Sequence, residues 1–398
     1  MNSNSFLILS RKLELWYEKK FVVPLVLPVR VQNEPWDIAK RLLSDESNGF
    51  FLDSGRFQKK IARYSYLGWS PFRIFRTRKS PNPISELRTL FSQYRGRKWL
   101  ELPFFTGGAI GYLSYELARA FEQLPDHARD DLDLDRMVFL FVRDLVVFDE
   151  QKRIYFLIAN LIPKIDGPFE KAFERAVRAI KEMKIKIMKR GTIPDHGDSP
   201  HFLGLAGRKR SDRQGSIFFR AKSRSASGRV LGNGKRTNGN SHFQIHGFQS
   251  DVSKREFKHM VRRAKEYIEA GDIYQVNLSQ RFSFEFKGQP ETLYESLRQI
   301  NPSPFSSFLK IGPLTVAGVS PERLIKLDGN MCETRPIAGT RPRGATRREE
   351  RRLRRDLMMS AKERAEHIML VDLERNDLGR VSEPHSVRVN GSSEPVLR

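Results

Sequence analysis

Apolar and polar residues alternate over a long stretch in the second half of the chain, from Tyr274 to Phe286. One face carries six apolar residues: Tyr274, Val276, Leu278, Phe282, Phe284 and Phe286. Gln280 alone interrupts that face. A period of two is typical of a strand with one buried side, so the pattern predicts a long strand here.

The stretch before it has the period of a helix. Ser253 and Glu256 have the spacing of a capping box, in which each side chain bonds the other's backbone N–H. Apolar residues then recur every three or four positions, at Phe257, Met260, Val261, Ala264 and Ile268. Gly271 suits the position just after a helix ends. We therefore predict an amphipathic helix that begins after Ser253.

Other segments show the same two periods. In the first half, residues 168–190 predict a helix with Phe169, Phe173, Val177 and Ile180 on one face, and 106–124 predict a glycine-rich strand followed by a helix. Residues 136–162 predict successive strands with a turn at 149–153. Further on, short strands are expected near 314–320 and 323–329, and a helix from Ser360. Strands joined by hairpins, with helices in runs, favour an α+β fold with antiparallel sheets over a doubly wound parallel sheet.

Composition agrees with a large folded protein. The chain has 398 residues, 39% of them hydrophobic and 28 of them Phe, enough for a sizeable core. A single cysteine, Cys332, excludes an internal disulfide framework and fits a reducing compartment. No apolar run is long enough for a membrane span, and the first residues lack the features of a signal peptide. We expect a cytoplasmic protein that does not bind a membrane.

The formal net charge of +24 is partly concentrated, because residues 201–250 hold ten Lys/Arg and one acidic residue. Most of this segment is rich in Gly, Ser and Asn without interleaved aromatics, which favours a solvated, disordered insertion over a nucleic-acid site. The sequence thus divides into a first block at 1–195, a basic insertion at 196–248 and a second block at 249–398. Arg347–Asp356 looks like one basic helix face.

Two carboxylates in the helix after Ser360 are candidate metal ligands. Glu363 and Glu366 are three residues apart and share a helix face, so they could hold a hard divalent cation such as Mg²⁺. The alternative is an exposed helix whose acids pair with Lys362 and Arg364. The apolar run 368–373 that follows favours a helix packed against a core.

A second candidate feature is the loop Thr334–Gly344, which has three arginines, two prolines and two glycines in eleven residues. Gly339 permits close approach to a ligand, Thr340 offers a hydroxyl and an N–H, and arginines favour carboxylates. This combination predicts an anionic ligand; the alternative is a structural loop whose arginines bind neighbouring acids. Glu322, after a strand and a turn, is a candidate acid or base, or else an ordinary turn glutamate.

Together these segments resemble a known family. Five motifs carry the resemblance in order: AGDIYQVNLSQRF (Ala270–Phe282), NPSPF (Asn301–Phe305), GVSPERL (Gly318–Leu324), ETRPIAGTRPRG (Glu333–Gly344) and KERAEHIMLVDLERNDLGRV (Lys362–Val381). In the first block, FLDSG, RYSYLGWSPF and GGAIGYLSYELARAFEQLP are also similar. The family is that of the chorismate-utilising enzymes, which includes component I of anthranilate synthase and of aminodeoxychorismate synthase. The resemblance covers most of the chain outside 196–248.

The resemblance implies two packed antiparallel sheets flanked by helices. It implies Mg²⁺ between the enzyme and a carboxylate of chorismate, with Glu366 as ligand and Glu363 beside it. It places Gly339 and Thr340 against chorismate and makes Glu322 an active-site carboxylate in proton transfer. Ammonia would come from a glutamine amidotransferase partner.

The two kinds of component I differ in few letters. FLDSG, GGAIGYLSYEL and YQVNLSQRF are closer to aminodeoxychorismate synthase, in the pathway to para-aminobenzoate and folate, and this is the member we favour. Ala338 is instead typical of anthranilate synthase, because many aminodeoxychorismate synthases have a nucleophilic lysine there. The family's regulatory tryptophan pocket would involve Ser54 and Pro304–Phe305–Ser306, although later pocket residues differ from the usual tyrosine and methionine.

The end of the sequence also departs from the family pattern. Family members continue for roughly another hundred residues after the segment that corresponds to DLGRVSEPHSVRV, and that part supplies a histidine, a tyrosine, an arginine and a second metal-binding glutamate. The resemblance therefore implies a fold incomplete at the C-terminus and a truncated catalytic domain. It leaves open a third interpretation, an inactive chain that at most binds its amidotransferase partner.

Overall fold

The computed structural model describes residues 10–55, 62–125, 130–189, 216–220 and 244–389. The chain forms two compact units: unit 1 comprises residues 1–222 and 300–398, and unit 2 comprises residues 223–299. The predicted division at 195 and 248 stays a prediction, since much of the basic segment lies outside the described residues. Two described parts of that segment are regular, however: Ser216–Arg220 and the start of β10 (Gln244–Ser250). Ser216–Arg220, around the apolar run Ile217–Phe219, forms strand β9 and not the irregular chain that we expected.

The largest element of unit 1 is an eight-stranded sheet with the order β1-β8-β7-β3-β2-β12-β13-β9. In that order its strands are Val23–Val29, Ile154–Leu161, Asp144–Asp149, Tyr64–Trp69, Asn48–Asp53, Phe305–Ile311, Leu314–Ser320 and Ser216–Arg220. Each neighbouring pair is antiparallel. Strands from both ends of the sequence therefore share one sheet, and β12 pairs with β2 across more than two hundred residues of chain.

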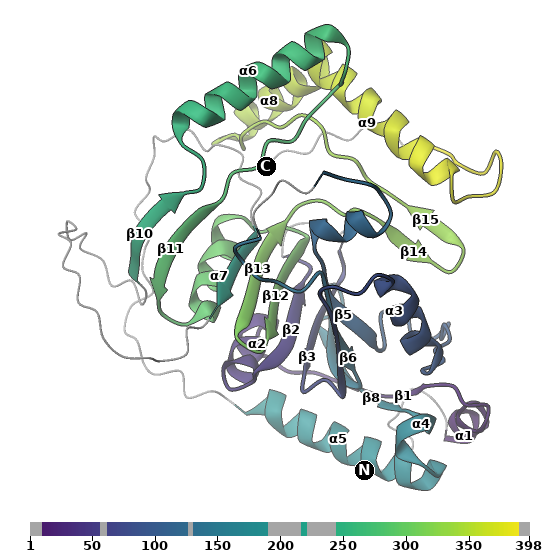
Figure 1. Ribbon diagram of the computed structural model, residues 1–398. Helices are drawn as coiled ribbons and strands as arrows, with labels where there is room; N and C mark the ends of the chain where they lie inside the picture. The colour runs from purple at the N-terminus through teal and green to yellow at the C-terminus, as the bar shows by residue number, and fades with distance from the viewer. Residues whose placement is uncertain (1–9, 56–61, 126–129, 190–215, 221–243, 390–398) are drawn as a thin grey trace. The chain divides into compact units, whose positions relative to one another are not determined.

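A second, three-stranded sheet packs on this one. Its order is β4-β6-β5, with strands Arg73–Thr77, Met137–Val142 and Gly108–Leu113. One cluster of buried side chains joins β6 to β2 and β12 of the large sheet: Phe50, Val138, Leu140, Val142, Leu309 and Ile311. Two packed antiparallel sheets with helices were expected, and this α+β fold is confirmed (Figure 1).

Helices cover the other face of the large sheet. Trp36 of α2 (Pro35–Ser44) contacts Phe51 and Phe308, with ring centroids 5.6 and 5.7 Å apart. The predicted helix after residue 168 is confirmed as α5 (Phe169–Met188), which packs on β8 (Figure 1). Its buried line is turned from the expected one and consists of Ala172, Ala176, Ile180, Met183 and Ile187. Among the described residues before 168, the other helices are α1 (Ser10–Glu18), α3 (Pro83–Ser92), the 3-10 helix η2 (Tyr115–Ala120) and α4 (Pro163–Asp166).

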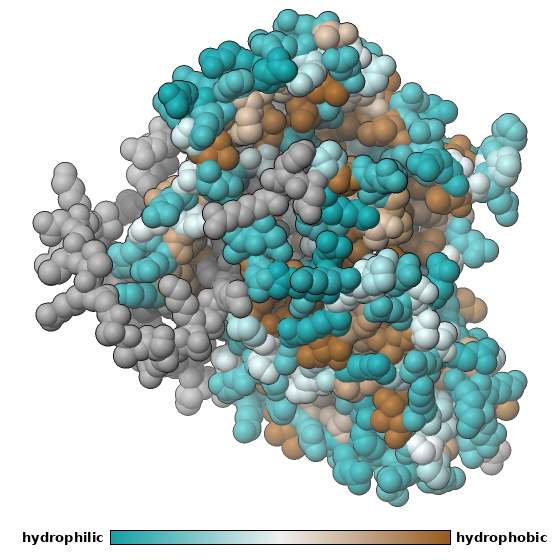
Figure 2. All heavy atoms as spheres, in the orientation of Figure 1, coloured by the Kyte–Doolittle hydropathy of each residue, from teal (hydrophilic) through white to brown (hydrophobic). Residues whose placement is uncertain are grey.

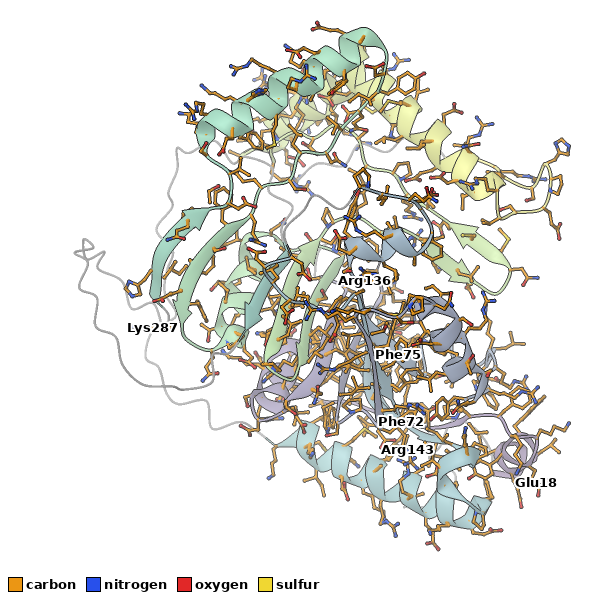
Figure 3. All side chains as sticks on the ribbon, viewed as in Figure 1. Glu18, Phe72, Phe75, Arg136, Arg143 and Lys287 are labelled. Carbon is orange, nitrogen blue, oxygen red and sulfur yellow. The ribbon has the colours of Figure 1, made fainter. Side chains whose placement is uncertain are left out.

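The predicted run of strands in 136–162 is confirmed, and the turn joins β7 to β8. The chain changes sheets between β6 and β7, at Arg143. Arg143 is labelled in Figure 3. The Arg143 guanidinium pairs with Asp166, and the Asn160 amide donates to the Arg143 carbonyl at 2.6 Å. Burial, reinforced by the nearby charge of Arg175, lowers the pKa of Arg143 to about 10. The glycine-rich strand expected in 106–124 is confirmed as β5, and the helix expected after it is the short 3-10 helix η2.

Unit 2 contains β10 (Gln244–Ser250), α6 (Lys254–Ala270) and β11 (Phe282–Lys287). Helix α7 (Pro290–Ile300) follows. The capping box of α6 is confirmed, with Glu256 N–H donating to Ser253 Oγ at 3.2 Å and Ser253 N–H to Glu256 Oε2 at 2.8 Å. Gly271 ends the helix in the left-handed region, at φ 83°.

The long strand predicted from Tyr274 to Phe286 is wrong in its first half, because the strand begins only at Phe282. Its partner β10 ends at Ser250, where the chain turns into α6. The residues before Phe282 thus have no strand beside them in the described part of unit 2, and a strand needs a partner for its backbone groups. Gln280 instead bonds Ser250 Oγ at 2.8 Å, and Tyr274 is 87% exposed.

The last part of unit 1 contains the hairpin β14 (Lys326–Asp328) and β15 (Met331–Glu333), then α8 (Arg347–Met359) and α9 (Ala361–Gly379). Among the described residues after Val319, the one buried hydrophobic side chain is Leu357. The packing of α9 against a core is therefore only partial: no α9 residue is buried, and Ile368 is 64% exposed. Apolar side chains also show among hydrophilic ones on the face seen in Figure 2. No described helix is long and apolar enough to cross a membrane.

Candidate active site

The candidate residues Glu322, Gly339, Thr340, Glu363 and Glu366 all lie in unit 1. Glu322 follows β13 in a turn, where the Glu322 N–H donates to Ser320 Oγ at 3.4 Å. The loop Thr334–Gly344 connects β15 to α8, and α9 begins directly after α8. Contacts between residues distant in sequence bring this strand end, the loop and the start of α9 to one part of the unit.

Glu322 is attached to the loop. Its Oε1 accepts a hydrogen bond from the backbone N–H of Ile337 at 2.9 Å, across fifteen residues of chain. The side chain is half-buried. Glu322 is thus more than a solvated turn glutamate, because its carboxylate fixes the middle of the loop.

Gly339 and Glu363 are in direct contact. Gly339 has φ 70°, and a Cβ placed on it would lie 2.6 Å from Glu363 Oε2 and 3.0 Å from Leu357 Cδ1. A glycine is required here both for the left-handed backbone and for the space. Ser360 caps α9 by accepting the Glu363 N–H at 3.4 Å, which places Glu363 in the first turn. The loop and the first turn of α9 are therefore fitted to each other.

Thr340 and Glu366 have different surroundings. The Thr340 carbonyl accepts from Arg341 Nη1 at 2.9 Å. Glu366 is half-buried and makes no hydrogen bond or ion pair within the described ranges. It is therefore the freer of the two candidate metal ligands, since Glu363 is already paired.

The donor set at this helix start fits Mg²⁺. Glu363 and Glu366 offer carboxylate oxygens, which this hard cation prefers. In the described part of the chain, no three His, Cys, Asp or Glu side chains gather closely enough to hold a metal ion. A pair of carboxylates suits Mg²⁺ in particular, because Mg²⁺ binds through one or two carboxylates and keeps several waters or substrate oxygens.

Each arginine of the loop has a carboxylate partner. Arg335 pairs with Glu333 at 2.9 Å, Arg341 with Glu363 at 3.1 Å and Arg343 with Glu350 at 2.6 Å. Of the two interpretations of the loop, the structure thus supports arginines that bind neighbouring acids. The hydrogen bonds from Gly344 N–H and Arg343 also lower the pKa of Glu350.

Glu374 is a residue that the sequence did not suggest. It lies on α9 eight residues after Glu366, about two helical turns further along. Burial raises its pKa, a hydrogen bond from Thr334 acts against this, and the charge of Glu322 raises it further. Its Oε2 is buried and has no hydrogen-bond partner among the described residues. The signal in the sequence that could have identified Glu374 is the recurrence of acidic residues along the helix after Glu366.

The predicted regulatory residues come together at one end of the large sheet. Ser306 stands opposite Asp53 in the pairing of β12 with β2, which brings Ser54 close to Pro304 and Phe305. The Ser54 and Ser65 hydroxyl oxygens are 3.1 Å apart, and Ser306 Oγ donates to the Ser303 carbonyl at 2.9 Å. Their role in regulation stays a prediction.

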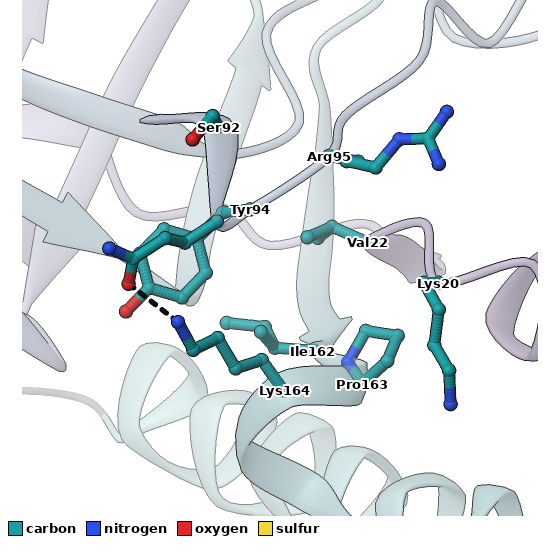
Figure 4. A pocket seen from close by; sticks show the side chains of 9 residues that line it. Lys20, Val22, Ser92, Tyr94, Arg95, Ile162, Pro163 and Lys164 are labelled. Atoms are coloured by element: carbon teal, nitrogen blue, oxygen red, sulfur yellow. Dashed lines mark hydrogen bonds between the residues drawn. The ribbon is translucent and has the colours of Figure 1, made fainter. Parts of the chain in front are cut away.

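A cavity of about 310 Å³ lies elsewhere in unit 1 and includes none of the predicted site residues. Its rim carries Lys20, Arg95 and Lys164. Figure 4 shows that the ends of Lys20 and Arg95 point away from the centre, while Lys164 bonds Gln93 Oε1 at 2.6 Å. Because the cations do not converge, this cavity is not a built anion site.

Comparison with known proteins shows the family of the chain. A family described as chorismate binding enzymes matches residues 48–394. The chain belongs to this family. The match includes every candidate residue of the site, from Ser54 to Glu366.

Three relatives show the range of the family. Anthranilate synthase component 1 of Acetivibrio thermocellus is 34% identical over 384 residues, which cover 92% of this chain and 70% of that protein. Aminodeoxychorismate synthase component 1 of Bacillus subtilis is 33% identical over 312 residues, covering 78% and 56%. The crystal structure of anthranilate synthase component I from Streptococcus pneumoniae superposes with a TM-score of 0.57 at 26% identity. That superposition covers 80% of this chain and 62% of the pneumococcal chain.

Proposed function

We propose that this protein is component I of an enzyme that aminates chorismate with ammonia. The observation that carries the proposal is the contact of Gly339 with Glu363, together with the bond from Ile337 N–H to Glu322. These contacts bring three of the five candidate groups to one loop of a chain that belongs to the chorismate binding enzymes.

The residues have distinct proposed roles. Glu366, with Glu363 beside it, holds Mg²⁺, which when bound would neutralise a substrate carboxylate and the charge of a leaving hydroxyl. Gly339 forms a flat wall for the ligand, and Thr340 offers its hydroxyl. Glu322 transfers a proton. The hydrogen bond from Ile337 N–H holds its carboxylate beside the loop, where it can act as a general acid or base.

We favour aminodeoxychorismate as the product, on the motifs FLDSG, GGAIGYLSYEL and YQVNLSQRF. The second candidate is anthranilate with pyruvate, and two observations favour it. Ala338 has no amine with which to attack the ring, so ammonia itself must attack. Several of the relatives, including that of Acetivibrio thermocellus, are named anthranilate synthase.

Ammonia would be supplied by a glutamine amidotransferase subunit, which is the proposed partner. The cytoplasmic location stays a prediction, because the described helices exclude only a helical membrane span within themselves.

The experiment is a product analysis. Purified chain with chorismate, ammonium and Mg²⁺ should yield a 4-amino product, whereas 2-aminobenzoate with pyruvate would identify the second candidate. Glu322→Gln should abolish turnover, and Glu383→Gln, an exposed residue beyond α9, should not. Turnover by the chain would refute the interpretation as an inactive protein. The proposed function would be refuted if chorismate were not turned over with ammonium, nor with glutamine and the amidotransferase subunit.

A further inference from the structure

Arg341 occupies one of the two oxygens of Glu363. Its Nη1 donates to Glu363 Oε1 at 3.1 Å and to the carbonyl of Thr340 at 2.9 Å. The two side chains are shielded, with 27% of Arg341 and 17% of Glu363 exposed. This pair is therefore better protected from solvent than most surface ion pairs.

The other oxygen of Glu363 is closed on the loop side. Oε2 lies against Gly339, where even a methyl group would come within 2.6 Å. A metal ion that binds Glu363 from the loop side must therefore take Oε1, which Arg341 holds. A guanidinium and a divalent cation repel each other and cannot both be neutralised by one carboxylate oxygen.

We propose that Arg341 competes with Mg²⁺ for Glu363 and, once displaced, binds an anionic carboxylate of the substrate. The proposal rests on the proposed function, because it takes Glu363 as part of the metal site. It adds that Arg341 couples the binding of Mg²⁺ to the binding of substrate. Mg²⁺ displaces Arg341 from Glu363, and the substrate carboxylate then neutralises the charge of Arg341.

The surroundings of Arg341 support this exchange. Its bond to Thr340, which is itself a proposed substrate contact, keeps the guanidinium at the loop when Glu363 is lost. Its planar fork of donors suits a carboxylate of the substrate as well as it suits Glu363. Mg²⁺ and chorismate should therefore bind cooperatively, each raising the affinity for the other by the same factor.

The first test is a calorimetric titration of the full chain with Mg²⁺ alone. Arg341→Gln should bind Mg²⁺ about fivefold more tightly, since a shielded pair of this kind is worth roughly 1 kcal/mol. Arg343→Gln is the matched control, because Arg343 is in the same loop but pairs with Glu350. It should leave the Mg²⁺ affinity unchanged. In a Glu363→Gln background, Arg341→Gln should no longer have an effect.

The second test is chorismate binding at saturating Mg²⁺, where Arg341→Gln should weaken the affinity and Arg341→Lys should restore part of it. Circular dichroism of each variant confirms that it is folded. Equal or weaker Mg²⁺ binding by Arg341→Gln, or no Mg²⁺ binding by any variant, would overturn the inference. These measurements need no turnover, so an inactive chain would refute the proposed function and leave the Mg²⁺ comparison decisive.

Discussion

Replacement of Gly339 by alanine tests whether the loop and Glu363 form one fitted surface. The backbone at Gly339 has φ 70°, and the added Cβ would meet Glu363 Oε2 at 2.6 Å and Leu357 Cδ1 at 3.0 Å. The left-handed backbone costs an alanine about 1–2 kcal/mol. Overpacking adds about 1–3 kcal/mol. Because Leu357 is the one buried hydrophobic residue among those described after Val319, we expect the loop to shift and the rest of unit 1 to stay folded.

The chain contains a matched control for this variant. Gly329, in the turn between β14 and β15, has φ 62°, and a Cβ there would meet nothing within 4 Å. Gly329→Ala thus has the backbone cost without the clash. Chemical unfolding should show Gly339→Ala to be less stable than Gly329→Ala by about 1–3 kcal/mol, which is the overpacking cost alone. Equal stabilities in the two variants would refute the contact between loop and carboxylate.

Three further predictions concern stability. Burial raises the pKa of Glu374, so its carboxyl stabilises the fold when protonated, and this contribution is lost as pH rises through the raised pKa. A glutamine does not ionise. In chemical unfolding, the stability of Glu374→Gln relative to wild type should therefore rise by less than about 1 kcal/mol between pH 4 and pH 8. Burial acts to raise the pKa of Asp149, but the hydrogen bond from Arg63 at 2.7 Å, the backbone N–H groups of Lys152 and Gln151 and the charge of Arg63 together outweigh it, and the pKa is lowered. Arg63→Met should therefore cost about 1.5–3 kcal/mol at pH 7 and less as pH falls through that pKa; an equal cost at pH 3 would contradict this. Ser360→Ala should lower the stability of α9 by about 1 kcal/mol, seen as faster amide exchange in its first turn, whereas an unchanged rate would show that the cap is not needed.

Local signals predicted the elements with strong period or strong caps. The capping box at Ser253 and the period in 168–190 gave α6 and α5, because both depend on residues within a few turns of each other. The predicted strand from Tyr274 was wrong because a strand also needs a neighbouring strand. The alternating residues do not show that the neighbour, β10, ends at Ser250. Pairing between distant segments, such as β12 with β2, was not predicted, because no local pattern records which strand lies beside which.

The candidate site was predictable to the same extent. Spacing placed Glu363 and Glu366 near one helix face, and the structure keeps them there. Spacing could not show that Arg341 already holds Glu363, since the loop and α9 are twenty-two residues apart at that contact. It also could not show that the half-buried Glu374 feels the charge of Glu322, because that depends on how the loop packs on α9.

The charge balance of the loop constrains how a dianion would bind. Each loop arginine is paired with a carboxylate: Arg335, Arg341 and Arg343. The positive charge of the loop is therefore already neutralised within the fold. Glu322 and Glu366 add negative charge to the same part of unit 1. A substrate with two carboxylates would therefore be repelled unless a cation arrives first. Chorismate binding should accordingly be undetectable without Mg²⁺ and should appear as Mg²⁺ is added, and full affinity in the presence of a chelator would show that the arginines leave their partners for the substrate unaided.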